Sequence, residues 1–131
     1  MEKELILDKK AFLVSKTNSK GVILFANDDF CRIANFKLEE LIGKPHNIVK
    51  HPDMPKKAFE DLWNTILSGN IWRGYVKNKI NGGGFYWVYA TVYPFKEKNG
   101  IINYLSCRRK ANDFEIVEHE NLYRQLKSKE L

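Results

Sequence analysis

The segment that decides the organisation of this chain is Pro45-His46-Asn47-Ile48-Val49-Lys50-His51-Pro52-Asp53-Met54-Pro55. It places three prolines, two histidines, a lysine and a carboxylate between an Ile-Gly turn and an amphipathic stretch. Each proline fixes its own φ and restricts the residue before it, so the backbone is stiff here. A stiff segment holds polar side chains toward an interior site at low entropic cost. The composition therefore favours a ligand site over a plain core.

After this segment, the chain predicts one helix and three strands. Apolar residues recur every three or four positions from Pro55 until Ser68-Gly69-Asn70, which predicts an amphipathic helix whose apolar residues are Ala58, Phe59, Leu62, Trp63, Ile66 and Leu67. From Trp72 the period becomes two, which predicts strands at 72–80, 85–95 and 101–110. Turns at 81–84 and 97–100 join these strands into an antiparallel meander.

Before the segment, strands are predicted at 11–17 and 22–27, joined by a turn that contains Asn18 and Gly21. Short helices follow at 28–34 and 37–42, and Asn112 with Glu115 predicts a capping box for a final helix to residue 131. Because strands and helices are segregated, we expect an α+β fold with helices on one face of a five-stranded antiparallel sheet. We divide the chain into a flank (1–11), a sensor domain (12–110) and a C-terminal helix or output segment (111–131). The natural ligand site is a cavity between helices and sheet.

Composition excludes several classes of protein. The 131 residues suit one domain, and no apolar run approaches the roughly 18 residues of a membrane span. The first residues do not resemble a secretory signal, so we expect a cytoplasmic location. The net charge is +6, but the basic residues are interspersed with carboxylates along the sequence, and no nucleic-acid-binding motif is present. Cys31 and Cys107 have no metal-ligand spacing, and no catalytic motif is present, so we expect neither a disulfide framework nor an enzyme.

Several motifs carry a resemblance to a known family. They are Ala26–Phe30, Gly43–Val49, His51–Pro55, Phe59–Trp63, Trp72–Gly74, Val76–Asn78 and Tyr86–Val88. Together with the element order, they resemble a PAS domain, and within that family the flavin-binding PAS domain of bacterial aerotaxis receptors. The resemblance covers residues 12–110. The His51–Pro55 string, followed by an aromatic helix and Val76-Lys77-Asn78, is its most specific part.

The resemblance implies a PAS fold that holds FAD without a covalent bond. It also implies a sensor that reports redox or oxygen-linked energy state to a chemotaxis receptor or signalling partner. Carried over by position, the residues associated with the cofactor are Asn27, Lys50, His51, Asp53, Phe59, Asp61, Trp63 and Asn78. The family usually has arginine where this chain has Lys50. Lysine keeps the charge but lacks the planar fork that binds two acceptors.

Individual residues support more than one interpretation. Asn78 carries both a donor and an acceptor, so a rotated amide matches either redox form of a flavin, yet between Lys77 and Lys79 it also reads as a solvent-facing polar residue. Phe59 and Trp63 lie four apart and either enclose a planar ring or belong to the core. Lys50 and His51 are candidates for the FAD pyrophosphate or the ring oxygens.

Two further functions compete with flavin sensing. One is a cofactor-free PAS interaction module, whose pocket is filled by its own Phe and Trp side chains. The other is a haem-based gas sensor that uses His51 as the axial ligand. A zinc site built from His46, His51, Asp53 and His119 fits no common spacing. Cys31 lies outside the segment expected to hold the cysteine of light-sensing flavin domains, so adduct chemistry is not expected.

The flanks carry apolar residues that we expect to form the output surface. They are Leu5, Ile6, Leu7, Phe114, Ile116, Val117, Tyr123 and Leu126. These residues suit docking on a second copy or on a receptor, either in the same polypeptide or in a separate one. A homodimer is therefore one of the predicted assemblies.

Overall fold

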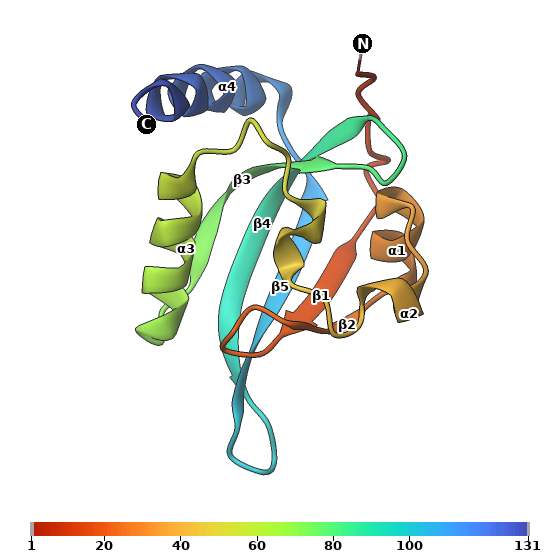
Figure 1. Cartoon of the computed structure of the whole chain (residues 1–131), viewed down its shortest axis with the longest axis vertical. Coiled ribbons are helices and arrows are strands. Elements are labelled where there is room, and N and C mark those ends of the chain that lie inside the picture. The colour runs from red at the N-terminus through yellow and green to blue at the C-terminus, as the bar shows by residue number, and fades with distance from the viewer. Residues whose placement is uncertain (1, 131) are drawn as a thin grey trace.

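The predicted order of strands and helices is observed, and the α+β class is confirmed (Figure 1). The computed structural model describes residues 2–130. In chain order the elements are β1 (Leu13–Thr17), β2 (Ile23–Ala26), α1 (Asp28–Ala34), α2 (Leu38–Leu41), the 3-10 helix η1 (His46–Val49), α3 (Lys56–Leu67), β3 (Trp72–Lys79), β4 (Phe85–Lys96), β5 (Ile102–Lys110) and α4 (Asp113–Ser128). Within the described residues, no helix has the length and apolar character needed to cross a bilayer.

The five strands form one antiparallel sheet in the order β2-β1-β5-β4-β3. β3, β4 and β5 make the predicted meander, and β1 with β2 makes the predicted hairpin. The pairing of β1 with β5 joins the hairpin to the meander and brings Leu13 opposite Arg108. Because side chains alternate along each strand, Asn78 and Arg108 both face the helical layer.

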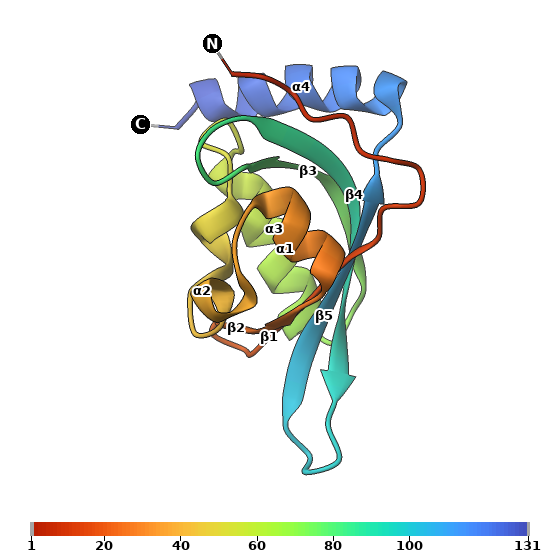
Figure 2. The same cartoon turned by 90° about the vertical axis from the view of Figure 1, so that its right-hand side faces the viewer.

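The helices α1, α2, η1 and α3 lie on one side of the sheet (Figure 2). Phe30, Leu41 and Ile66 from this layer are almost fully buried. Burying a large apolar side chain stabilises the fold by about 1.5–3 kcal/mol. The prediction of Leu67 on the apolar face of α3 is wrong, since 56% of this residue is exposed. A helix rotates about 100° per residue, so the neighbour of a fully buried Ile66 points away from the core.

The C-terminal helix α4 lies across one end of the sheet (Figures 1 and 2). Its N-cap is Asn112, as predicted, and the Asn112 side chain accepts hydrogen bonds from the backbone N–H groups of Phe114 and Glu115. A capping box would also have the Glu115 carboxylate accept from the Asn112 backbone N–H. Instead, the Glu115 carboxylate accepts a hydrogen bond from the Tyr75 hydroxyl. Tyr123 then donates to the Tyr75 carbonyl at 2.6 Å, which fixes α4 against β3.

The N-terminal segment pairs with the start of β4. Leu5 N–H donates to the Phe85 carbonyl at 2.8 Å, and Phe85 N–H donates to the Lys3 carbonyl at 3.1 Å. Of the apolar residues predicted to form an output surface, Leu7 and Tyr123 are buried within the domain. Those that remain exposed are Leu5, Ile6, Phe114 and Val117. The two flanks therefore pack on the domain itself and leave only part of their apolar surface free.

Candidate functional site

A cavity of about 290 Å³ lies between α3, the segment around η1 and the inner face of the sheet. We call it the central cavity, and it occupies the place where a ligand site was expected. Its volume is at the lower end of the range for small-molecule pockets, about 300–1,000 Å³. Its lining includes Val49, Lys50, Phe59, Trp63, Asn78 and Arg108.

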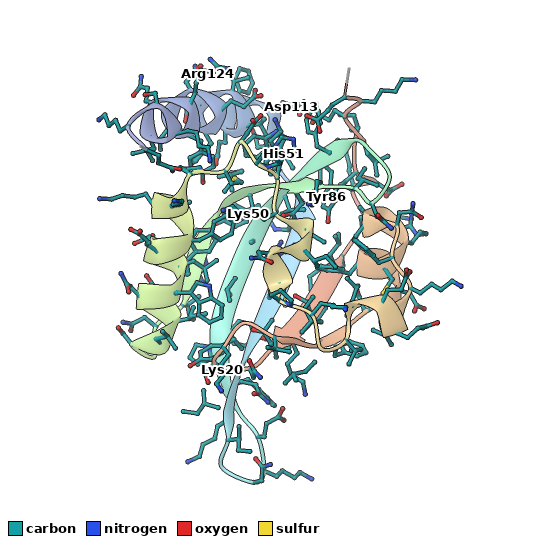
Figure 3. The ribbon with its side chains drawn as sticks, viewed as in Figure 1. Lys20, Lys50, His51, Tyr86, Asp113 and Arg124 are labelled. Atoms are coloured by element: carbon teal, nitrogen blue, oxygen red, sulfur yellow. The ribbon has the colours of Figure 1, made fainter. Side chains whose placement is uncertain are left out.

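The central cavity is bordered by an open hollow on the surface of α3. Lys50, Phe59 and Trp63 line both spaces, and the open hollow, of about 500 Å³, is completed by Lys56, Glu60 and Asn64. The two spaces therefore adjoin at Lys50, Phe59 and Trp63. In Figure 3, Lys50 lies between α3 and η1, whereas Lys20 lies toward the other end of the cavity.

The aromatic wall of the cavity comes from α3. Phe59 and Trp63 are half-buried, and the Lys50 ammonium lies 5.3 Å from the centre of the Phe59 ring. Trp63 packs edge-on to Tyr104 with 6.0 Å between ring centres. The β1–β2 turn closes on Trp63 at Gly21, whose φ is +78° and where an added Cβ would lie 3.1 Å from Trp63 Cζ2. Glycine is needed here because a side chain would be strained and crowded against the indole.

Asn78 points into the cavity and is only 1% exposed, so its interpretation as a solvent-facing strand residue is wrong. With its amide oxygen toward Arg108, Asn78 accepts a hydrogen bond from Arg108 Nη1 at 2.8 Å and donates to the Val49 carbonyl at 3.1 Å. The opposite orientation would set amide N–H groups against the guanidinium donors, so this one is preferred. A backbone bridge between Lys50 and Asn78 fixes the same contact.

Arg108 is a cavity residue that the sequence analysis missed. It is 4% exposed, and its Nε donates to the Ser106 hydroxyl at 2.7 Å. Burial lowers the pKa of Arg108 and the nearby Tyr86 acts in the opposite direction, but a guanidinium keeps its charge in proteins. In the sequence, Arg108 stands beside Arg109 and Lys110 and resembles part of a basic surface. Strand alternation, with β5 in the middle of the sheet, was the one signal that could have separated it from Arg109.

His46 also lines the cavity, and it is neutral at physiological pH. Its Nε2 lies 2.9 Å from the Ser15 hydroxyl, and its ring packs edge-on to Phe30. Burial of the imidazole and the charge of Arg108 lower the pKa of His46 to about 3. The positive charge deep in the cavity therefore comes from Arg108 and not from histidine.

Two of the predicted cofactor residues, His51 and Asp53, lie outside the lining of the central cavity. His51 is buried, its Nδ1 accepts from Asp53 N–H at 3.0 Å, and its Nε2 therefore donates to the Glu2 carboxylate at 2.9 Å. The Asp53 carboxylate accepts from Lys77 Nζ at 2.8 Å, and this contact lowers the pKa of Asp53. Figure 3 shows His51 on the side of the molecule nearest α4. Both ring nitrogens are engaged, which leaves neither free to bind haem iron.

Asn27 and Asp61 also lie outside that lining. The Asn27 side chain caps α1 through Phe30 N–H, accepts from Val14 N–H at 3.0 Å and donates to the Phe12 carbonyl at 2.8 Å. Asp61 lies on the exposed side of α3 and accepts from Trp72 Nε1 at 2.8 Å. Four of the eight predicted residues are thus brought together in the cavity, namely Lys50, Phe59, Trp63 and Asn78.

A second hollow, of about 350 Å³, lies beneath α4 and is lined by residues that include Asp53, Lys77, Trp87 and Tyr123. Two of its lysines are already paired with carboxylates, Lys77 with Asp53 and Lys127 with Glu130. Over residues 2–130, no group of three or more His, Cys, Asp or Glu side chains is placed to hold a metal ion.

Comparison with known proteins identifies the family. A family model described as the PAS fold matches residues 23–108. The chain therefore belongs to the PAS fold family, and the resemblance found in the sequence is confirmed.

Two curated relatives narrow the comparison. The chain is 45% identical to the aerotaxis receptor of Escherichia coli (strain K12) over 114 residues, which are 87% of this chain and 22% of the receptor. It is 26% identical to the nitrogen fixation regulatory protein of Klebsiella oxytoca over 105 residues, 79% of this chain and 21% of that protein. The chain thus spans about a fifth of the length of each relative.

Solved structures share the fold. A light-oxygen-voltage domain studied with a flavin analogue superposes with a TM-score of 0.70 and 19% identity, over 87% of both chains. The light state of the blue-light photoreceptor Aureochrome1 LOV gives a TM-score of 0.68 and 18% identity, over 92% of both chains. At these identities the likeness establishes the five-stranded sheet with its helical layer and nothing finer.

Proposed function

We propose that this chain is a sensor domain that holds FAD in the central cavity and reports the redox or oxygen-linked energy state of the cell. The observation that carries the proposal is the donor set of the cavity. Aromatic walls at Phe59 and Trp63, the buried amide of Asn78 and the buried cation of Arg108 meet in one space. This combination suits a planar, polar, electron-accepting ring. When bound, FAD would supply the redox chemistry, and the protein would supply binding and electrostatics.

The size of the site supports a cofactor with a ring and a charged tail. The central cavity is small for the whole of FAD, and the open hollow that adjoins it at Lys50 would take the remainder. Lys20, Lys50 and Lys56 border the two spaces and suit a pyrophosphate. His51 and Asp53 would act from behind the wall, because they do not line the cavity themselves and their contacts hold the segment that carries Lys50.

Asn78 is the residue that would couple the cofactor to the rest of the domain. Its amide presents a donor or an acceptor to the cavity, depending on its orientation. Rotation would break the hydrogen bonds to Arg108 and Val49, and so would alter the contact between β3 and the Lys50 segment. The neighbouring His51 is bonded to Glu2, so the N-terminal segment lies one residue from this contact. The signal would leave the domain through its flanks.

The relatives support a role in signalling. An aerotaxis receptor at 45% identity favours a chemotaxis partner, in the same polypeptide or in a separate one, and a homodimer is one assembly through which the flanks would act. In this role the protein would not turn over a substrate, because reduction of the cofactor is the input signal.

The visible spectrum of the purified protein, before and after incubation with excess FAD, tests the proposal. We expect a two-banded flavin spectrum that survives gel filtration and bleaches with dithionite. Heat release followed by chromatography then identifies FAD against FMN and riboflavin. A protein that stays colourless after reconstitution contradicts the proposal, and a haem absorption band would replace it with gas sensing.

One observation favours a second function, a cofactor-free interaction module. Asn78, Arg108 and Val49 satisfy one another without any ligand. In that case the central cavity would be a packing defect, and FAD would neither bind nor raise the melting temperature. The same reconstitution experiment separates the two functions.

A further inference from the structure

Arg108 is a buried cation without a counter-charge. It is 4% exposed, and within residues 2–130 none of the ion pairs joins it to a carboxylate. Its partners are the Ser106 hydroxyl and the Asn78 amide, both neutral. A charge removed from water costs free energy unless it is paired. The fold therefore keeps an unbalanced positive charge in the wall of the central cavity.

The titratable groups around Arg108 do not balance this charge. Burial raises the pKa of the Tyr86 hydroxyl, so Tyr86 stays protonated and neutral. His46 is neutral because its pKa is lowered to about 3. Each of these groups faces the cavity or its wall from a different element. The charge that a ligand meets there is that of Arg108 at any physiological pH.

The other cations of the cavity stand nearer to solvent. Lys20 is exposed, and Lys50 is half-buried and shared with the open hollow. These lysines reach the parts of a ligand that remain near water. Arg108 reaches only the part that enters deepest, against the sheet. The sequence analysis named Lys50 and His51 as candidates for the FAD pyrophosphate or the ring oxygens, and the buried position of Arg108 makes it a further candidate for the ring.

We propose that Arg108 is the residue that selects the charge of the bound ligand, by contacting the ring end of the cofactor and favouring its reduced, negatively charged form. This inference rests on the proposed function and specifies how the site is regulated. A cation that binds the reduced ring more tightly than the oxidised ring raises the midpoint potential of the bound flavin. The protein would thereby set the redox threshold at which it responds.

The test compares Arg108→Gln and Arg108→Lys with Arg109→Gln, an exposed neighbour on the opposite face that lies over the Tyr89 ring. The midpoint potential of the reconstituted protein is measured by reductive titration against a reference dye. We expect Arg108→Gln to weaken binding of reduced flavin at least tenfold relative to oxidised flavin, a fall of about 30 mV for a two-electron couple. Arg108→Lys should recover part of this, and Arg109→Gln should match the wild type.

Affinities for riboflavin, FMN and FAD locate the contact. A ring contact predicts the same fold-change in Kd on Arg108→Gln for all three. A fold-change that grows with the number of phosphates and vanishes for riboflavin would overturn the inference, as would an unchanged midpoint potential. In both cases flavin still binds the wild type, so the proposed function survives while the inference fails.

A third variant, Arg108→Met, separates a functional arginine from a structural one. Arg108→Met removes an uncompensated buried charge, but it also leaves the buried Asn78 amide oxygen without its donor, so some loss of melting temperature is expected. We expect Arg108→Met to remain folded at the temperature of the flavin titration and to lose the preference for reduced flavin there. A folded Arg108→Met that keeps the wild-type preference would overturn the inference, whatever its melting temperature.

Discussion

Asn78 and Arg108 meet across the inner face of the sheet, although β4 separates their strands. Arg108 Nη1 donates to the Asn78 amide oxygen at 2.8 Å. The same amide donates to the Val49 carbonyl at 3.1 Å, so one side chain joins the sheet to the segment that carries Lys50. Any ligand in the central cavity must therefore accommodate this contact or replace it.

Asn78→Ala removes both hydrogen bonds at a buried site. The Val49 carbonyl and one guanidinium group lose their partner, which costs about 1–3 kcal/mol. We expect a lower urea midpoint and loss of bound flavin. Asn70→Ala, an exposed change after α3, serves as the control and should leave both quantities unchanged. If Asn78→Ala kept flavin and showed wild-type reduction-coupled changes in its flanks, Asn78 would not be the coupling residue.

Stability should fall with acid because of His46. The unfolded histidine binds a proton near pH 6.5, whereas the folded pKa is about 3, so the stabilising contribution is complete above pH 6.5 and is lost as pH falls. The loss approaches about 1.4 kcal/mol per pH unit below that point. Urea titrations between about pH 5 and 7 measure it.

His46→Gln should flatten this pH dependence. Carboxylates with lowered pKa values, such as Asp53 and Glu97, act in the same direction but only at lower pH. An equal slope in His46→Gln and the wild type would show that His46 is not responsible.

Trp63→Ala should weaken the binding of flavin without unfolding α3. Trp63 is half-buried and lines both the central cavity and the open hollow. An aromatic contact of this kind contributes about 0.5–1.5 kcal/mol, so we expect Kd to rise by up to roughly tenfold. Leu67→Ala, on the exposed side of the same helix, is the matched control. Identical Kd values for the two variants would remove Trp63 from the site.

Glu2→Gln should loosen the N-terminal segment. His51 donates to the Glu2 carboxylate, and a hydrogen bond to a charged group is worth about 1.5–3 kcal/mol when well formed. Glu2 is half exposed, so we expect a smaller value, near ~1 kcal/mol. Hydrogen exchange of the Leu5 amide, which bonds to Phe85, reports the change. Lys3→Gln is the control, and equal protection in both would refute a role for Glu2 in holding the segment.

Blue light should leave the flavin spectrum unchanged. Cys31 is half-buried on α1, does not line the central cavity, and has a thiol pKa raised by burial. A neutral thiol outside the cavity is not placed to form a bond to the ring. Illuminated wild type and Cys31→Ala should have identical absorption. Reversible bleaching that depends on Cys31 would contradict this placement.

Much of the fold was predictable because strands, helices and helix caps depend on patterns among residues that are close in sequence. Alternation set the strands at 72–80, 85–95 and 101–110, and the stripe from Ala58 to Ile66 set α3. Asn112 signalled the start of α4 through its cap, which is also local. The family resemblance then identified Lys50, Phe59, Trp63 and Asn78, which the structure gathers in one cavity.

The sequence by itself determined the elements, their order and the PAS family, since these depend on periodicity, turn residues and motif spacing. Only the tertiary structure decided which side chains share the cavity. In the structure, His51 bonds to Glu2 and Asp53 bonds to Lys77, both outside the cavity lining. Arg108 is buried, whereas its neighbour Arg109 is exposed. The reason is physical: burial and hydrogen-bond partners arise from segments far apart in the chain, such as β5 and η1, whose meeting no local pattern encodes.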